Sequence, residues 1–141
     1  MPNLEKYSDQ AVFIGRLFFS SMFLLFAYDK LTGYAGTVSY MSSLGLPAPS
    51  LVTLLAIIIE LGGGLLMLVG YQTRLVALGL AIYVLISALI GHFQLGDFDH
   101  YQHFMKNMAI VGGALALVAF GGGAYSLDAN KSSKQLRMTY A

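Results

Sequence analysis

Hydrophobic residues gather into four long runs along the chain, and shorter polar segments separate them. The runs cover about 11–29, 51–71, 74–93 and 104–123. Each is close to the 20 or so residues that an α-helix needs to cross the hydrocarbon core of a bilayer. Backbone groups in lipid must find their hydrogen bonds within the segment, which makes each run a helix. The pattern therefore predicts an all-α integral membrane protein, a four-helix bundle with four transmembrane helices.

The connections between the runs differ in length and character. The second and third runs are joined only by Tyr71–Thr73, which predicts that these two helices are antiparallel neighbours. The first connection, about 30–50, mixes apolar and polar residues, and part of it is expected to form a short helix lying on the membrane. Pro47 and Pro49 mark the boundary between this connection and the second run. The connection at 94–103 is polar and aromatic, and we expect it to be a loop.

The distribution of Lys and Arg predicts the orientation. With four spans both termini share one side, which would hold five of the eight basic residues: Lys6, Arg74, Lys131, Lys134 and Arg137. The positive-inside rule then places the N- and C-termini in the cytoplasm. We interpret residues 1–141 as a single domain whose last part, 129–141, is a polar tail.

Composition narrows the class of protein further. Hydrophobic residues make up 57% of the chain and charged residues 11%, against about 25% charged in ordinary soluble domains. The net charge of +1 gives no basic surface for nucleic acid. The chain contains no Cys, which excludes disulfides, a catalytic thiol and iron–sulfur clusters held by Cys. No phosphate-binding loop or dinucleotide fingerprint is present.

Glu60 is the most informative single residue. It lies near the middle of the second run, where a charged side chain costs roughly 2.5–3.5 kcal/mol on membrane-insertion scales. A helix that serves only as an anchor would carry Leu at this position. Two interpretations stay open: Glu60 forms an ion pair or hydrogen bond that fixes helix packing, or it is a ligand-binding or proton-handling acid.

Candidate partners for Glu60 lie near the outer ends of the other runs. Lys30, His92 and Lys106 come from three different runs, and we expect them to converge with Glu60 in the outer half of the bundle. Asn107 adjoins Lys106 and adds an amide to the same region. The alternative is that the lysines extend outward to the membrane surface and that His92 bonds to a carbonyl at a helix end.

Arg16 lies about five residues inside the cytoplasmic end of the first run. It is either an anchor at the inner membrane surface or a partner for Glu60 or Asp128, because the guanidinium group suits contacts with carboxylates. Both interpretations remain open.

The three histidines raise the possibility of a metal or haem site. His100 and His103 are three residues apart and His92 precedes them. There is neither a Cys partner nor a His-x-x-x-His pair on an apolar helix. We therefore predict no metal site and interpret these residues as polar groups of a solvated loop.

Short motifs in a fixed order also resemble a known family. They are Gly15-Arg16, Lys30-Leu-Thr-Gly-Tyr34, Leu44-Gly-Leu-Pro47, Glu60-Leu-Gly-Gly-Gly-Leu-Leu66, Gly70-x-x-Thr-Arg74, His92, Phe104-Met-Lys-Asn107 and Gly121-x-Gly-Ala-Tyr-Ser-Leu-Asp128. With these motifs, residues 12–128 resemble the DoxX family of small bacterial inner-membrane proteins.

The resemblance implies a four-helix bundle in the bacterial inner membrane, and it carries several functional expectations. Some members of that family resemble the small subunit of a thiosulfate:quinone oxidoreductase. Others are linked to membrane redox complexes or to the handling of quinones and aromatic compounds. Distant eukaryotic relatives act as assembly chaperones or cargo receptors. Because the chain lacks Cys, a thiol-based redox role cannot run on its own side chains.

Three functions follow as hypotheses. The first is a redox-associated membrane subunit that holds a quinone or small aromatic ligand in an interior polar pocket, working with a redox partner protein or as a homo-oligomer. The second is a non-enzymatic scaffold or assembly subunit, and the third is a small proton-coupled carrier. The candidate ligand-binding residues are Glu60, His92, Lys106, Asn107, Lys30 and Arg16.

Overall fold

Five α-helices form the fold in the computed structural model, which describes residues 4–94 and 96–130. A short 3₁₀-helix, Leu4–Tyr7, leads into α1 (Ser8–Thr32), α2 (Tyr34–Ser43), α3 (Pro49–Val69), α4 (Thr73–His92) and α5 (Phe98–Phe120). The described part of the chain contains no strand. Helices α1, α3, α4 and α5 are each long and apolar enough to cross a membrane. The predicted all-α bundle with four membrane-spanning helices is confirmed.

Local backbone preferences set the ends of α3. Pro49 occupies the start of the helix, where its missing N–H costs no hydrogen bond. Gly70 ends the helix in the left-handed conformation, with φ of 68°, a conformation that glycine adopts without a steric penalty. The chain reverses within Gly70–Gln72 and enters α4 at Thr73. Helices α3 and α4 are therefore antiparallel and joined by a tight turn, as the sequence predicts.

The start of α5 differs from the prediction. The helix begins at Phe98, six residues before the predicted position 104, so most of the segment 94–103 is helical and not a loop. Asp97 caps the helix, because its Oδ1 accepts a hydrogen bond from the backbone N–H of His100 at 3.0 Å. Hydropathy alone misses these turns because their side chains are polar.

The short helix expected in the first connection is present as α2. The Tyr34 hydroxyl donates to the carbonyl oxygen of Ser50 at 3.1 Å and ties the start of α2 to the start of α3. The position of α2 relative to a membrane surface stays a prediction.

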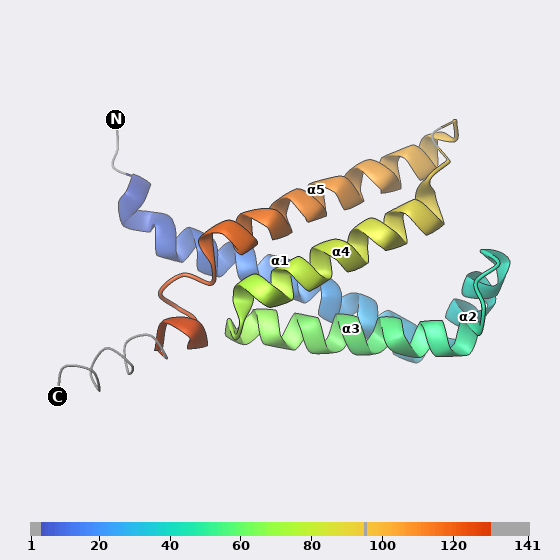
Figure 1. Ribbon diagram of the computed structural model, residues 1–141, viewed down its shortest axis with the longest axis horizontal. Coiled ribbons are helices and arrows are strands. Elements are labelled where there is room, and N and C mark those ends of the chain that lie inside the picture. The colour runs from blue at the N-terminus through green and yellow to red at the C-terminus, as the bar shows by residue number, and fades with distance from the viewer. Residues whose placement is uncertain (1–3, 95, 131–141) are drawn as a thin grey trace.

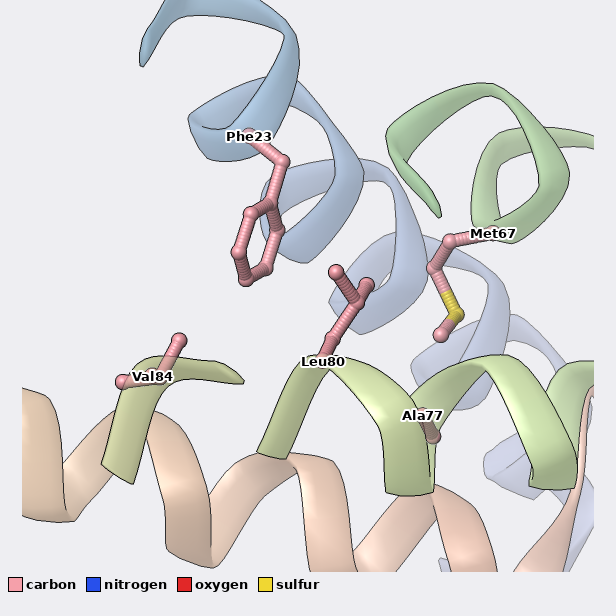
Figure 2. Packing of buried hydrophobic residues seen from close by; sticks show 5 residues of the cluster. All are labelled: Phe23, Met67, Ala77, Leu80 and Val84. Carbon is pink, nitrogen blue, oxygen red and sulfur yellow. The ribbon is translucent and has the colours of Figure 1, made fainter. Parts of the chain in front are cut away.

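The helices pack as two close pairs. Helix α1 runs along α3 and α4 runs along α5, whereas α3 and α4 diverge from their shared turn (Figure 1). A small apolar core forms where α1, α3 and α4 meet. Figure 2 shows its members, Phe23, Met67, Ala77, Leu80 and Val84, with Leu80 pointing from α4 toward α1 and α3. Many large apolar side chains outside this core are exposed, as expected for helices surrounded by lipid.

The glycines after Glu60 allow neighbouring helices to approach. A Cβ atom at Gly63 would lie 2.7 Å from a methyl carbon of Leu80 on α4, and one at Gly64 would lie 2.9 Å from a methyl carbon of Leu24 on α1. A side chain at either position would force the neighbouring leucine to shift. The run of glycines therefore brings α3 close to two helices in the half of the bundle nearest the α3–α4 turn.

Candidate functional site

Glu60 is buried in the bundle and has two partners. Its side chain is 3% exposed. The Nζ of Lys30 lies 2.9 Å from its Oε1, and the Tyr83 hydroxyl donates to the same oxygen at 2.6 Å. An opposite charge and a hydrogen-bond donor offset much of the cost of removing a carboxylate from water. We call Glu60, Lys30 and Tyr83 the Glu60 cluster.

Each member of the Glu60 cluster comes from a different membrane-spanning helix. Glu60 lies on α3, Tyr83 in the middle of α4 and Lys30 near the end of α1. The Lys30 ammonium also lies 5.5 Å from the centre of the Phe26 ring, one turn earlier on α1. Lys30 is therefore directed toward Glu60. The structure favours the interpretation that Lys30 is a partner of Glu60 over the one in which it extends to the membrane surface.

Sequence reasoning missed Tyr83. A tyrosine in the middle of an apolar run is itself a signal, because a hydroxyl buried in lipid or protein needs a partner. Most other tyrosines of the chain lie near span ends, where the hydroxyl reaches water. Tyr83 was thus recognisable as a candidate partner for the single acid in the adjacent run.

The Glu60 cluster lines a cavity of about 690 Å³. This volume lies within the range of about 300–1,000 Å³ typical of small-molecule sites. All five helices contribute to its walls, which are mostly apolar. The polar side chains that line it are Lys30, Tyr40, Glu60, Tyr83, Ser87, His92 and Asn107.

The polar groups of the cavity are spread along its length. His92 lies nine residues after Tyr83 on α4, which corresponds to about 13–14 Å along the helix axis. Tyr40 of α2 reaches α4 close to His92, because a Cβ at Gly91 would lie 3.2 Å from the Tyr40 hydroxyl. The cavity thus has the charged Glu60 cluster deep in the bundle and an imidazole at the end next to α2, with a largely apolar wall between them.

The early start of α5 brings the three histidines together. The His92 ring lies 5.0 Å from the His103 ring and 5.7 Å from the His100 ring, measured between centroids. The Nδ1 atoms of His92 and His100 are buried without a hydrogen-bond partner. Among residues 4–94 and 96–130, no group of three or more His, Cys, Asp or Glu side chains is arranged to hold a metal ion. The histidines form a contact between helix ends, not a solvated loop.

Of the three residues expected to converge with Glu60, the structure brings Lys30 to the Glu60 cluster but neither His92 nor Lys106, which corrects the expected convergence. Lys106 is exposed on α5 and does not line the cavity, although its neighbour Asn107 does. Lys106 lies eight residues inside α5, whereas Lys30 lies two residues from the end of α1, and the rotation of α5 leaves the Lys106 side chain exposed. Hydropathy carries no information about helix rotation, so the sequence could not separate the two lysines.

Arg16 holds the opposite end of the molecule together. It is 1% exposed and donates to the carbonyl oxygens of Gly122 at 2.9 Å and Tyr125 at 2.5 Å. Asp128 lies within electrostatic range of its guanidinium group. Of the two carboxylates considered as partners, the structure therefore brings Asp128 close to Arg16, and Arg16 fixes the segment that follows α5.

Asp128 in turn caps α4. Its carboxylate accepts hydrogen bonds from the backbone N–H groups of Gln72 and Thr73 at 2.7 and 2.8 Å, and from the Thr73 hydroxyl at 2.8 Å. Its backbone N–H donates to the carbonyl oxygen of Gly70 at 3.0 Å. A carboxylate at a helix N-terminus is favourable both as a cap and for the helix dipole. We call Arg16, Asp128 and the α3–α4 turn the inner clamp.

The Glu60 cluster and the apolar cavity wall together suit the binding of a ligand that has both a hydrogen-bonding oxygen and an apolar ring. The Lys30 ammonium has three N–H donors and is partly exposed to the cavity, so it can donate to a ligand oxygen while it holds Glu60. Glu60 is a carboxylate in a mostly apolar setting. The surrounding apolar wall suits a flat hydrophobic ring.

Comparison with known proteins agrees with this architecture. The sequence pattern of the DoxX family matches residues 11–93, which include α3 and α4. The chain is 39% identical over 125 residues to inner membrane protein YqjF of Escherichia coli (strain K12), covering 89% of this chain and 95% of that protein. It is 38% identical over 120 residues to inner membrane protein YphA of the same organism, covering 82% and 86%. No solved structure matches.

Proposed function

The chain belongs to the DoxX family and is an integral, multi-pass inner-membrane protein, and from this premise we propose that it binds a quinone or a small aromatic molecule in the cavity beside Glu60. The observation that carries the proposal is a buried, paired carboxylate in the wall of a mostly apolar cavity of about 690 Å³. Intramembrane ionisable groups mark functional sites more often than not.

The cavity walls match the two parts of such a ligand. Phe23, Phe26 and several aliphatic side chains offer surfaces for a ring. Lys30 lines the cavity and can donate to a ring oxygen, because its ammonium has N–H donors besides the one that faces Glu60. Our proposal places the ring against the apolar wall, with one oxygen directed at the Glu60 cluster.

Glu60 is the proposed proton-handling residue. Reduction of a quinone consumes two electrons and two protons, and oxidation of the quinol releases them. The chain shows no motif for an electron-carrying cofactor and has no Cys. We therefore propose a redox-associated subunit that holds the ligand, while a partner protein supplies or removes the electrons.

A binding measurement tests the proposal. We expect the purified protein in lipid nanodiscs to bind a short-chain quinone, and we expect the double variant Lys30→Met/Glu60→Gln to bind it about tenfold more weakly or worse. The reason is the loss of charge-assisted hydrogen bonds, each worth about 1.5–3 kcal/mol. The double variant avoids leaving a charged group buried alone.

Lys106→Met is the matched control. It removes the same type of side chain from another membrane-spanning helix, at a position that does not line the cavity. Binding that is unchanged in the double variant, or equally weakened by Lys106→Met, would overturn the proposal. Thermal unfolding of each variant shows that loss of binding is not loss of fold.

The pairing of Glu60 Oε1 with both Lys30 and Tyr83 also favours a second function. A carboxylate held by Lys30 and Tyr83 can have a purely structural role, in which it fixes the packing of α1, α3 and α4. Such a role is expected for a scaffold or assembly subunit. In that case the variant Lys30→Met/Glu60→Leu keeps both its fold and its association with partner proteins, because a buried ion pair can be replaced by apolar groups at little cost. Loss of function in this variant, despite normal folding, would count against the scaffold.

A further inference from the structure

The cavity has two apolar edges that are exposed to the outside of the bundle. Leu55 and Ile59 form the edge on α3, and Ile82, Ile86 and Ile90 form the edge on α4. These five residues line the cavity and are nevertheless 40–51% exposed. Along each helix they recur every four residues, so each set forms one continuous row. We call the two rows the portal.

The portal results from the divergence of α3 and α4. Near their shared turn the two helices touch, because Gly63 admits the Leu80 side chain. Farther from the turn they separate, and Figure 1 shows the widening space between their ribbons. The residues of α3 and α4 that line the cavity lie within 52–60 and 79–92, away from the shared turn. The opening is therefore built into the way α3 and α4 are joined.

The portal faces lipid and not water. All five of its residues lie inside membrane-spanning helices. Ile90 follows Ile82 by eight residues, which corresponds to about 12 Å along the helix axis. The opening therefore runs along the helices and not across their ends. An apolar opening at this depth is in contact with acyl chains.

The end of the cavity nearest His92 differs in character from the portal. Tyr40 and Met41 of α2, with Leu44 and Leu46 after it, line that end. The Tyr40 hydroxyl reaches across to α4 beside Gly91. That end therefore carries the polar groups of Tyr40 and His92, whereas the portal is purely apolar.

We propose that the ligand enters sideways from the bilayer through the portal and that it carries an alkyl or isoprenoid tail. The tail stays between the portal rows, while the ring lies in the cavity with its oxygen at the Glu60 cluster. The inference rests on the proposed function and adds the class of ligand: a lipid-soluble amphiphile. Its support is the match of polarity, because the charged groups lie deep in the wall and the edges are purely apolar.

The test compares two ligands with the same quinone ring, one with a decyl tail and one with a methyl group, in nanodiscs. Affinities are expressed per mole of membrane-dissolved ligand, so that partitioning into lipid is removed from the comparison. The variant Ile86→Trp fills the portal from α4. Its control is Leu89→Trp, since Leu89 is 48% exposed on the same helix but does not line the cavity.

We expect the wild type and Leu89→Trp to bind the tailed ring equally, and Ile86→Trp to bind it about tenfold more weakly or worse, because the indole occupies the space of the tail. The methyl ring should lose much less affinity in Ile86→Trp. A second pair on α3, Leu55→Trp against Ile58→Trp, repeats the comparison should Ile86→Trp fail to fold. Ile58 is exposed and does not line the cavity.

The outcomes separate the two proposals. Equal binding of the tailed ring by the portal variants and their controls, or equal lipid-corrected affinity for both rings, overturns lateral entry while the binding function stands. Failure of the wild type to bind either ring overturns the proposed function, and the lateral entry with it.

Discussion

At the scale of single residues, the environment of Glu60 decides what its charge can do. The carboxylate shares one oxygen between Lys30 and Tyr83, while its Oε2 is buried without a hydrogen-bond partner. The sequence identified Glu60 as a buried acid because a charge in an apolar run is costly wherever it lies. It could not choose between Lys30 and Lys106, because that choice depends on how each helix is rotated.

Tyr83 should contribute to stability through its hydroxyl. We expect Tyr83→Phe to lower the free energy of unfolding by about 1.5–3 kcal/mol, because the lost hydrogen bond goes to a charged acceptor. Unfolding of the purified protein in mixed micelles measures the change. Tyr28→Phe is the control, since Tyr28 is exposed on α1 and should change stability little. Equal effects of the two substitutions would show that the Tyr83 hydroxyl does not support Glu60.

Removal of one partner from the ion pair should cost more than removal of both. We expect Lys30→Met alone to destabilise the protein by about 3–5 kcal/mol, because it leaves a carboxylate buried without its cation. The double variant Lys30→Met/Glu60→Gln should recover much of this loss. Unfolding in mixed micelles of the single and double variants measures the coupling, and simple additivity of the two substitutions would contradict a direct ion pair.

At the scale of helices, the ends of the elements depend on contacts distant in sequence. The start of α4 is capped by Asp128, more than fifty residues later, and the segment after α5 is held by Arg16 of α1. Sequence patterns gave the position of α3 and α4 to within about two residues, as is usual for helix ends. They misplaced the start of α5, because the polar turns around His100 do not raise the local hydropathy.

The inner clamp makes Gly70 sensitive to substitution. Both Gly70 and Gly45 have positive φ, at 68° and 72°. A Cβ at Gly70 would run into the Arg16 guanidinium group and Ser126, whereas one at Gly45 has open space. We expect Gly45→Ala to cost about 1 kcal/mol from backbone strain alone and Gly70→Ala to cost clearly more. The difference between the free energies of unfolding of the two variants measures the steric clash at Gly70. Equal losses of stability would show that the inner clamp adjusts to the added Cβ atom without an energetic penalty.

At the scale of the whole molecule, the bundle is two helix pairs joined at one end. Pairing of α1 with α3 and of α4 with α5 leaves a wedge between the pairs, and the cavity with the Glu60 cluster lies there. Each helix is apolar enough to span the membrane alone, so its insertion does not depend on tight packing. Because insertion does not require tight packing between the helices, the bundle can contain a cavity and still remain inserted in the bilayer.

The predicted orientation can be tested with single cysteines, because the chain has none of its own. We expect a membrane-impermeant thiol reagent to label Ser43→Cys in intact cells and to label Lys6→Cys only after the cells are opened. Both positions are exposed in the structure. The expectation follows from the excess of Lys and Arg on the side of the termini. The reverse labelling pattern would place the termini outside.

The sequence by itself determined the class of protein, the four membrane spans and the presence of one buried acid. These properties are sums over local residues, and the cost of an unpaired charge in an apolar run can be read from that run alone. Only the tertiary structure decided that Lys30 and Tyr83 hold Glu60, that Arg16 belongs to the inner clamp and that Lys106 lies outside the cavity. Those outcomes depend on the rotation and divergence of the helices, which contacts such as Gly63 with Leu80 set and which no local pattern of hydrophobic residues records.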